Sequence, residues 1–419
     1  MYEWSEEHQM MRDAMRRFVE AEIVPNLEEL EHGDTPPYEV LRKLWSTFGM
    51  DAAARDRFKR QMDREKAVAA GEAEASAEKR GGGGDGSMTL IPIIEICRYC
   101  PGMVTAMGVS VGLTASAIMS KGTTAQKERW ALDLLTMEKI GSWAITEPDS
   151  GSDAFGSMKA TARRDGDEYV LNGSKTFITN GPYADTIVFI CKLDEGASSP
   201  ALKGRSGPGA DERKILSFVL DSGMPGLEQS KPLRKMGMHS SPTGQLFLDD
   251  VRVGIDRLLG ETEDLPSGGR AGAKDTFSME RTGVAAMSLG IVERCLELCT
   301  EYAKERVQFG KPIGEFQLIQ LKRAKMEVAR LNIQNLVFRQ IEMAANGTGM
   351  DLTEASACKL YSAQAAMEVA LEAVQVFGGN GYMAEYQVEQ LARDAKVLQI
   401  YAGTDEIQIS QIARNLLSA

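Results

Sequence analysis

The sequence predicts a mainly helical protein with a small β domain at its centre. Residues 1–140 and 257–419 carry apolar side chains at helical spacing, whereas residues 141–256 alternate strand-like segments with turns. No G-x-G-x-x-G follows a predicted strand, which argues against a Rossmann dinucleotide site. We therefore expect three domains in the order helical, β, helical.

Composition narrows the classes of function. The chain has 419 residues, 43% of them hydrophobic, enough for more than one buried core. Its net charge of -12 argues against a nucleic-acid partner. The six cysteines are scattered, so we expect free thiols and a cytoplasmic location. Cys97 and Cys100 form a lone CxxC without a nearby histidine, and no metal site is expected. We identify no signal peptide and no apolar run of about 20 residues, and so expect no membrane association.

The N-terminal domain is predicted to be helical on both sides of an insertion. Trp4, Met11, Met15 and Phe18 recur at helical spacing, and residues 90–140 are also helical in character. Residues 51–88 form the insertion. Its charged, alanine-rich part could be an exposed helix, and its four glycines at 81–84 are expected to be flexible. These glycines are not a phosphate-binding loop, because no strand precedes them and no Gly-Lys-Ser/Thr follows.

The central domain contains several predicted strands, among them "TIVFICKL", "ILSFVLD" and "TGQLFLDDVRV". Within "KATARRDGDEYVLNGSKTFITNG", turns are predicted at Asp165-Gly166 and at Asn172-Gly173. Residues 196–212 are rich in Ser, Gly, Pro and Ala and are expected to form a surface loop.

Five short motifs carry the functional signal: "SWAITEPDSGSD" (142–153), "KTFITNG" (175–181), "RVQFGKPIGEFQ" (306–317), "QVFGGNGY" (375–382) and "YAGTDEIQ" (401–408). Alone, each of the first two would be an ordinary β-hairpin. In this combination, order and spacing, the five resemble the acyl-CoA dehydrogenase family of flavoproteins, over nearly all of the chain outside 51–88. The resemblance implies an N-terminal helical domain, a central β-barrel-like domain and a C-terminal four-helix bundle, assembled as a homotetramer. It also implies FAD, an acyl-CoA substrate and an electron-transferring flavoprotein as partner.

The resemblance implies cofactor contacts at matching positions. One flavin-facing strand would contain Trp143, Ile145 and Thr146. A second would contain Phe177, Ile178 and Thr179, with Thr179 near N5 of the ring. The turn near the pyrophosphate and the CoA arm would contain Gly151 and Ser152. A neighbouring subunit's contacts to the adenosine half of FAD would come from Arg306, Gln308, Phe309 and Gln317. Its pyrophosphate contacts would come from Gln375, Gly378 and Gly379. The helix start that binds phosphate would contain Thr404 and Glu406. These residue types suit the roles, because glycine allows close backbone approach and a helix N-terminus favours an anion.

The catalytic base is not at its usual position. The implied reaction is α,β-dehydrogenation of an acyl-CoA thioester, in which a base removes the α proton while a hydride leaves Cβ for flavin N5. Most relatives place a glutamate just before the Gly-Thr of the last motif, but this chain has Ala402 there. Glu280 shares an apolar helical stripe with Phe277, Val284 and Met287, so it should face the interior and have a raised pKa. From periodicity alone, a glutamate paired with arginine or a helix end that reaches solvent stays open.

The stretch "MERTGVAA" resembles the isovaleryl-CoA and long-chain members of the family, which place the base in a Glu-Arg pair on this helix. This implies Glu280 as the base, and Arg281 near the carboxylate and CoA; a solvated helix charge is the alternative for Arg281. The backbone N–H of Ala402 can still donate to the thioester oxygen, since that contact needs no side chain. Ser152 is expected to contact the CoA arm.

Two departures and two alternative activities stay open. His239 replaces an arginine that is frequent in the family, and we expect a structural substitution, with altered contacts to CoA or a neighbouring subunit as the alternative. Ser278 stands where several relatives carry an acidic residue near the adenine of CoA. The alternative activities are an acyl-CoA oxidase and a non-catalytic scaffold subunit. Acyl-chain length is not indicated, because the relocated base serves both short branched and long straight chains.

Overall fold

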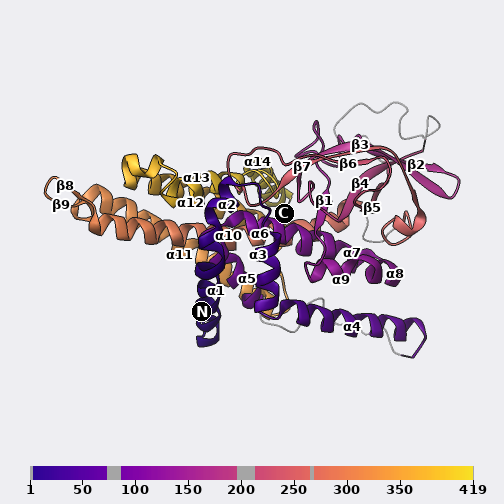
Figure 1. Cartoon of the computed structure of the whole chain (residues 1–419), viewed down its shortest axis with the longest axis horizontal. Coiled ribbons are helices and arrows are strands. Elements are labelled where there is room, and N and C mark those ends of the chain that lie inside the picture. The colour runs from indigo at the N-terminus through magenta and orange to yellow at the C-terminus, as the bar shows by residue number, and fades with distance from the viewer. Residues whose placement is uncertain (1–2, 73–85, 196–212, 265–268, 419) are drawn as a thin grey trace.

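The computed structural model describes residues 3–72, 86–195, 213–264 and 269–418. It has the three domains that the sequence predicts, namely a helical N-terminal domain, a central β domain and a C-terminal helical domain (Figure 1). The predicted glycine-rich loop at 81–84 and the predicted loop at 196–212 lie outside the described residues.

The N-terminal domain is a series of short helices. Ser5 caps the first of them by accepting from the backbone N–H of His8, while the His8 ring reaches back to Ser5. The elements, including π and 3-10 segments labelled η, are α1 (Glu6–Phe18), η1 (Val19–Ile23), η2 (Val24–Asn26), α2 (Leu27–His32), α3 (Tyr38–Thr47), α4 (Met50–Ala69), α5 (Gly86–Cys97), α6 (Pro101–Met107), η3 (Gly108–Ala115), α7 (Ser116–Lys121), α8 (Thr124–Gln126), η4 (Lys127–Ala131) and α9 (Leu132–Leu135).

The first part of the insertion is a helix, as predicted, but it is not simply exposed. Ala54, Phe58 and Met62 recur every four residues along α4 and are buried, and Phe58 and Met62 join the core beneath the β domain. The remaining faces of α4 are charged, and Glu65 pairs with Lys127 at 2.9 Å. The high charge of this segment concealed a narrow apolar stripe that packs against the protein.

One helical run qualifies the expectation of no membrane association. The segment Pro101–Lys121 is long and apolar enough to cross a membrane by length and composition, which the sequence analysis overlooked. About half of that window is buried inside the protein, and Ser110 within it accepts a hydrogen bond from the backbone N–H of Gly141. A core helix passes the same test, and the packing of this segment against β1 (Gly141–Ala144) matches that description.

The central domain is built on a seven-stranded sheet with the order β1-β4-β2-β3-β7-β6, and β5 pairs with β4. β4 is buried along almost its whole length, which explains its continuous apolar sequence. The predicted turn at Gly166 is confirmed: it joins β2 to β3, and its φ of 64° suits glycine. The remaining strands are β2 (Thr161–Asp165), β3 (Glu168–Thr179), β4 (Thr186–Asp194), β5 (Ile215–Asp221), β6 (Leu227–Gln229) and β7 (Thr243–Gly254), followed by η6 (Ile255–Arg257).

The predicted turn at Asn172-Gly173 is wrong. Both residues lie inside β3, where the pairing with β7 shifts register between Leu171 and Gly173. Gly173 has a φ of 143°, and a β-carbon there would lie 2.6 Å from the β-carbon of Ala160. Glycine therefore serves a bulge and a close approach of the chain at this position, and a local sequence pattern does not separate that role from a turn.

The C-terminal domain consists of long helices that pack around α10 and extend away from the β domain (Figure 1). The predicted apolar stripe of α10 is confirmed over its described part, because Val284, Met287, Ile291 and Cys295 are all buried. The elements are α10 (Gly269–Glu305), β8 (Val307–Gln308), β9 (Lys311–Pro312), η7 (Ile313–Glu315), α11 (Gln317–Ala345), α12 (Leu352–Phe377), η8 (Gly378–Tyr382), α13 (Gln387–Val397) and α14 (Asp405–Ser418).

Candidate active site

Glu280 lies on α10 in an environment that favours its neutral form. The side chain is half-buried, and loss of solvation raises its pKa from the ordinary 4.5 to about 7, against the opposing positive charges of Arg281 and Lys359. Arg281 is buried and donates to Ser356 Oγ at 3.0 Å on α12. The neighbourhood therefore combines a carboxyl group that titrates near neutrality with two cations that favour its ionised form.

The turn before α14 lies beside Arg281. Ala402 and Gly403 have positive φ angles of 53° and 88°, and Gln408 Nε2 donates to the carbonyl oxygens of both at 2.9 Å. Arg281 Nη2 lies 3.7 Å from where a β-carbon on Gly403 would stand. The fold thus brings Arg281 beside this turn and Glu280 close enough to Tyr401 for its charge to act there, although more than a hundred residues separate the turn from α10 in sequence.

Tyr401 links this turn to the inner helices. Its hydroxyl donates to Met287 Sδ at 3.2 Å and also faces Thr105. Loss of solvation raises the pKa of Tyr401, and the nearby Glu280 carboxylate raises it further. One turn of α10 separates Met287 from Gly283, and a β-carbon on Gly283 would meet no atom within 4 Å. The α10 surface at Gly283, three residues from Glu280, is therefore open.

The two predicted flavin strands run side by side in the β domain. Thr176 N–H donates to the Thr146 carbonyl at 2.9 Å, which joins the segment after β1 to β3. Trp143, Ile145 and Thr146 are half-buried, as is Thr179, and Ile178 is buried. Phe177 has a φ of 57° at a second register shift in β3, and 67% of it is exposed. An exposed phenylalanine on a strained backbone costs free energy, which is expected where a ligand surface is built.

Gly151 and Ser152 are exposed in the turn that follows. Glu147 and Ser150 exchange backbone hydrogen bonds at 3.1 Å, and Ser150 Oγ donates to the Asp153 carbonyl at 2.8 Å. A β-carbon on Gly151 would meet no atom within 4 Å, so this turn leaves room for a ligand to approach its backbone.

The predicted adenosine and pyrophosphate residues gather in a second place. A cavity of about 280 Å³ is lined by Arg306, Gln308, Gly378 and Gly379, among others. Neither glycine would place a β-carbon within 4 Å of another atom. Gln317 and Gln375 are exposed, and 94% of Phe309 is exposed at the tip of the β8–β9 hairpin. Backbone openness beside an arginine suits a phosphate-bearing ligand.

This second group is remote from the flavin strands of the same chain. In Figure 1, β8 and β9 lie at one end of the molecule and the β domain lies at the other. Thr404 precedes α14, where its hydroxyl accepts from the N–H of Ile407 at 3.4 Å, and Glu406 is exposed in the first turn. A single chain therefore does not bring all the predicted cofactor residues together.

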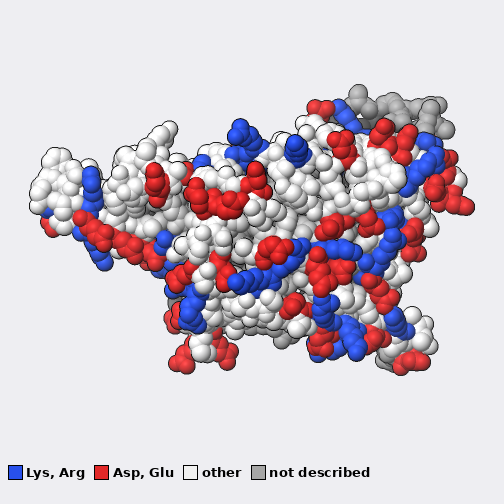
Figure 2. Space-filling model, in the orientation of Figure 1, with Lys and Arg blue, Asp and Glu red and all other residues white. Residues whose placement is uncertain are grey.

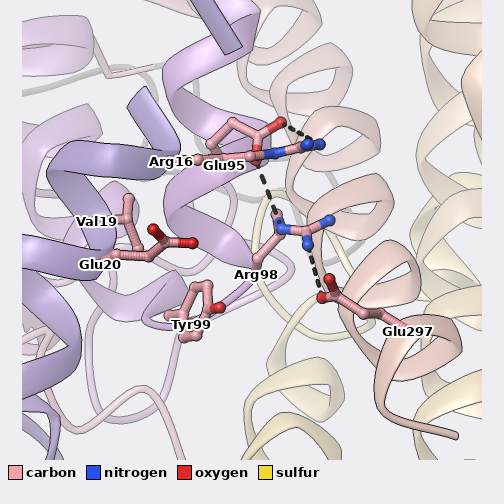
Figure 3. A pocket seen from close by; sticks show the side chains of 7 residues that line it. All are labelled: Arg16, Val19, Glu20, Glu95, Arg98, Tyr99 and Glu297. Carbon is pink, nitrogen blue, oxygen red and sulfur yellow. Dashed lines mark hydrogen bonds and ion pairs between the residues drawn. The ribbon is translucent and has the colours of Figure 1, made fainter. Parts of the chain in front are cut away.

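Another cavity, of about 170 Å³, lies between α1, α5 and α10, away from Glu280 (Figure 3). Arg16 and Arg98 both pair with Glu95, at 2.8 and 3.5 Å, and Arg98 also pairs with Glu297 at 2.7 Å. Because Arg16, Arg98, Glu95 and Glu297 form ion pairs with one another, this part of the cavity is a polar junction between helices.

Comparisons with known proteins agree with this arrangement. Family models match three parts of the chain: "Acyl-CoA dehydrogenase, N-terminal domain" over 5–54 and 50–138, "middle domain" over 142–251 and "C-terminal domain" over 267–417. The chain belongs to the acyl-CoA dehydrogenase family. As a member of that family it is an enzyme.

Relatives of this acyl-CoA dehydrogenase differ in their described activities. A 3-(aryl)acrylate reductase of Clostridium sporogenes is 34% identical over 415 residues, which cover 99% of each protein. The butyryl-CoA dehydrogenase structure from Megasphaera elsdenii is 32% identical with a TM-score of 0.82, and all of both chains is covered. A chain from a structure described as an electron transferring flavoprotein of Acidaminococcus fermentans is 31% identical with a TM-score of 0.80, again over all of both chains.

Several residues of the dehydrogenase site were missed in the sequence. Lys359 has no exposed side-chain surface, and its Nζ lies 3.3 Å from Asp405 Oδ1. Ser356 accepts a hydrogen bond from Arg281, and Gln408 donates one to the carbonyl of Ala402. Lys359 falls on the apolar face of α12, between Ala355 and Ala363, so a charged residue on a buried stripe was the available signal. Outside the site, His239 contacts the backbone carbonyls of Glu31 and Lys235 at 2.6 and 2.9 Å, which supports the structural interpretation of that substitution.

Proposed function

We propose that this enzyme introduces a double bond between Cα and Cβ of an acyl-CoA thioester, with FAD as cofactor and Glu280 as base. The observation that carries the proposal is that Glu280 has a pKa of about 7 and acts electrostatically on Tyr401, the residue before Ala402. A carboxyl group that titrates near neutrality suits general-base work at physiological pH. Alanine at position 402 leaves the proton transfer to Glu280, and its backbone N–H serves the thioester oxygen.

Each neighbouring group has a role in this reaction. The Glu280 carboxylate accepts the α proton, and Arg281 and Lys359 favour the ionised form that does so. The N–H of Ala402 stabilises negative charge that develops on the thioester oxygen. FAD, when bound, supplies the acceptor for the β hydride. This is the base position that the resemblance of "MERTGVAA" to the isovaleryl-CoA and long-chain members implies, whereas the relatives compared above include a butyryl-CoA dehydrogenase and do not single out that group.

The chain has residues that fit the parts of FAD. The flavin would lie against the exposed Phe177 and the half-buried Trp143, Thr146 and Thr179. The open glycines Gly378 and Gly379 beside Arg306 fit a phosphate and adenosine half. Ser152 and Arg281 are proposed to contact the CoA portion of the substrate.

We further propose that a complete site requires a second copy of the chain, in a homotetramer. The separation of the Arg306 group from the β domain supports this (Figure 1). The arm that carries the C-terminal helices shows broad uncharged areas in Figure 2. Its exposed apolar residues include a row on α11, namely Leu318, Leu321, Val328 and Leu331. Such a surface is typical of a subunit interface. An electron-transferring flavoprotein is the proposed acceptor, and the cytoplasm the proposed location.

Anaerobic mixing with a panel of acyl-CoAs tests the reaction, with flavin bleaching as the readout. The panel runs from short branched to long straight acyl groups and includes an arylpropionyl thioester. Glu280→Gln keeps the size of the side chain but cannot accept the α proton. Glu297→Gln, on the same helix and paired with Arg98, is the matched control.

Bleaching by the wild type and Glu297→Gln, but not by Glu280→Gln, would support both the reaction and the base. Equal bleaching by all three would contradict the assignment of Glu280. A wild-type protein that binds no flavin would contradict the proposed dehydrogenation. Oxygen consumption during turnover would instead indicate an oxidase.

A further inference from the structure

A lysine is buried inside the β domain, directly behind the segment proposed to face the flavin. Lys175 on β3 has no exposed side-chain surface, and its partner Glu147 is 4% exposed. Lys175 Nζ donates to Glu147 Oε1 at 2.9 Å and to the Ile145 carbonyl at 3.0 Å, and it lies 5.2 Å from the ring centroid of Phe189. Removing an ammonium group from water is costly, so its contacts must compensate for that loss.

Glu147 extends these contacts into the neighbouring backbone. Its two carboxylate oxygens accept from the N–H groups of Lys159 at 2.6 Å and Ala160 at 2.9 Å. Its own backbone exchanges two hydrogen bonds with Ser150. The pair therefore fixes the Ile145 carbonyl at one end of the loop and the 147–150 turn at the other.

The residues at and after these anchors differ in exposure. Ile145 and Thr146 are half-buried, and Gly151 and Ser152 are exposed. All four are proposed contacts of FAD or of CoA. Ile145 packs against the core of the β domain, whereas the hydrogen bonds of Glu147 hold the turn that leads to the exposed Gly151 and Ser152.

We propose that the Lys175–Glu147 pair positions this loop for the cofactor, so that residues 145–152 bind FAD without first having to reorganise. This rests on the proposed FAD-dependent function. Lys175 reaches the predicted flavin segment only through the backbone carbonyl of Ile145, and Glu147 acts through its own turn, so both are positioning residues.

Energetics favour positioning over simple stabilisation. A buried ion pair commonly gives little net stability, because desolvation of both charges offsets their attraction, and a neutral replacement of similar shape is often tolerated. Burial lowers the pKa of Lys175 while Glu147 raises it, which reflects the same balance. Geometric precision is what the pair contributes, since hydrogen bonds to an ionised group are short and directional.

The double variant Lys175→Met/Glu147→Gln removes both charges and nearly preserves both shapes. Its matched control is Lys127→Met/Glu65→Gln, which removes a partly buried Lys–Glu pair of the same 2.9 Å length between η4 and α4. Three quantities are measured for each protein: the Kd of the apoprotein for FAD, the midpoint potential of the bound flavin, and the melting temperature of the apoprotein. Lys175→Met alone, which leaves Glu147 its backbone N–H donors at Lys159 and Ala160, provides the same readouts if the double variant folds poorly.

We expect the Lys175→Met/Glu147→Gln variant to bind FAD at least about tenfold more weakly, the lower end of what loss of an orienting partner costs. Its flavin potential should shift while its apoprotein melts like the control. An unchanged Kd and potential would overturn the proposal, as would weaker binding that merely parallels a loss of apoprotein stability. Failure of the wild type to bind FAD would be a failure of the proposed function, and is distinguished by the wild-type titration.

Discussion

The pKa of Glu280 can be tested through the pH dependence of turnover. Only the ionised carboxylate accepts a proton, and its pKa is about 7. Ionisation should then rise from about 10% at pH 6 to about 90% at pH 8, which predicts a roughly tenfold increase in kcat/KM over that interval. A glutamate with an ordinary pKa of 4.5 would already be about 97% ionised at pH 6 and would give an almost flat profile.

A second perturbation tests the cause of this shift. Arg281 is the strongest charge that opposes the raised pKa, so Arg281→Gln should move the rising limb of the profile to higher pH. Arg294→Gln, on the same helix but paired with Glu297, should leave the limb in place. The assay is the initial rate with an artificial acceptor from pH 5.5 to 9, fitted for kcat/KM, because that ratio reports the free enzyme. The reasoning would be refuted if kcat/KM of the wild type did not change with pH, or if Arg281→Gln left the midpoint of the rising limb unchanged.

Three further predictions concern other parts of the chain. Burial and the nearby Asp394 charge raise the pKa of Glu31 from 4.5 to about 8, so the folded state keeps a proton that the unfolded state loses. The free energy of unfolding in urea should therefore fall as the pH rises from 4.5 to 8, and Glu31→Gln should flatten that dependence. Phe58→Ala should cost about 3 kcal/mol by leaving a cavity under α4, and hydrogen exchange should locate the loss in that helix. Cys97 and Cys100 are buried with thiol pKa values raised by burial, so a thiol reagent should modify them only after unfolding.

The sequence was sufficient for the architecture because its periodicities are long and unambiguous. Glu280 could be placed toward the interior from the stripe it shares with Val284 and Met287, and those two residues are buried. The position of Ala402 opposite Glu280 could not be obtained this way. Contacts between α10 and the turn before α14 join segments far apart in sequence, and only the resemblance to a family linked them.

What the sequence obscured is mostly polar and buried. Lys175, Lys359 and Glu147 look like ordinary surface residues in isolation, because a strand or helix pattern does not reveal a compensating partner on another element. Gly173 was interpreted as a turn because a bulge and a turn share the same residue preference. The charged residues of α4 hid Phe58, whose burial depends on helices that come about seventy residues later.

The same geometry allows the base to be moved between two positions. Ala402 already has a φ of 53°, and Gln408 holds its carbonyl at 2.9 Å, so a longer side chain would leave from a turn that is fixed in place. Arg281 Nη2 lies 3.7 Å from where a β-carbon on Gly403 would stand, so its positive charge would favour an ionised carboxylate at position 402. Glu280→Ala should abolish flavin bleaching, and adding Ala402→Glu should restore it to about a hundredfold above the single variant, the lower end of what a positioned base contributes.

Ala402→Glu with Glu280 intact would place two carboxyl groups in one site. Their repulsion should raise the pKa of one of them and move the rising limb of the kcat/KM profile to higher pH. The matched control is Ala402→Gln, which has the same length and no charge to add, and should leave the limb unchanged. If Glu280→Ala/Ala402→Glu folds and binds FAD yet bleaches no faster than Glu280→Ala, the two positions do not face the same substrate carbon. The account of Ala402 as the vacated position of the base would then be wrong.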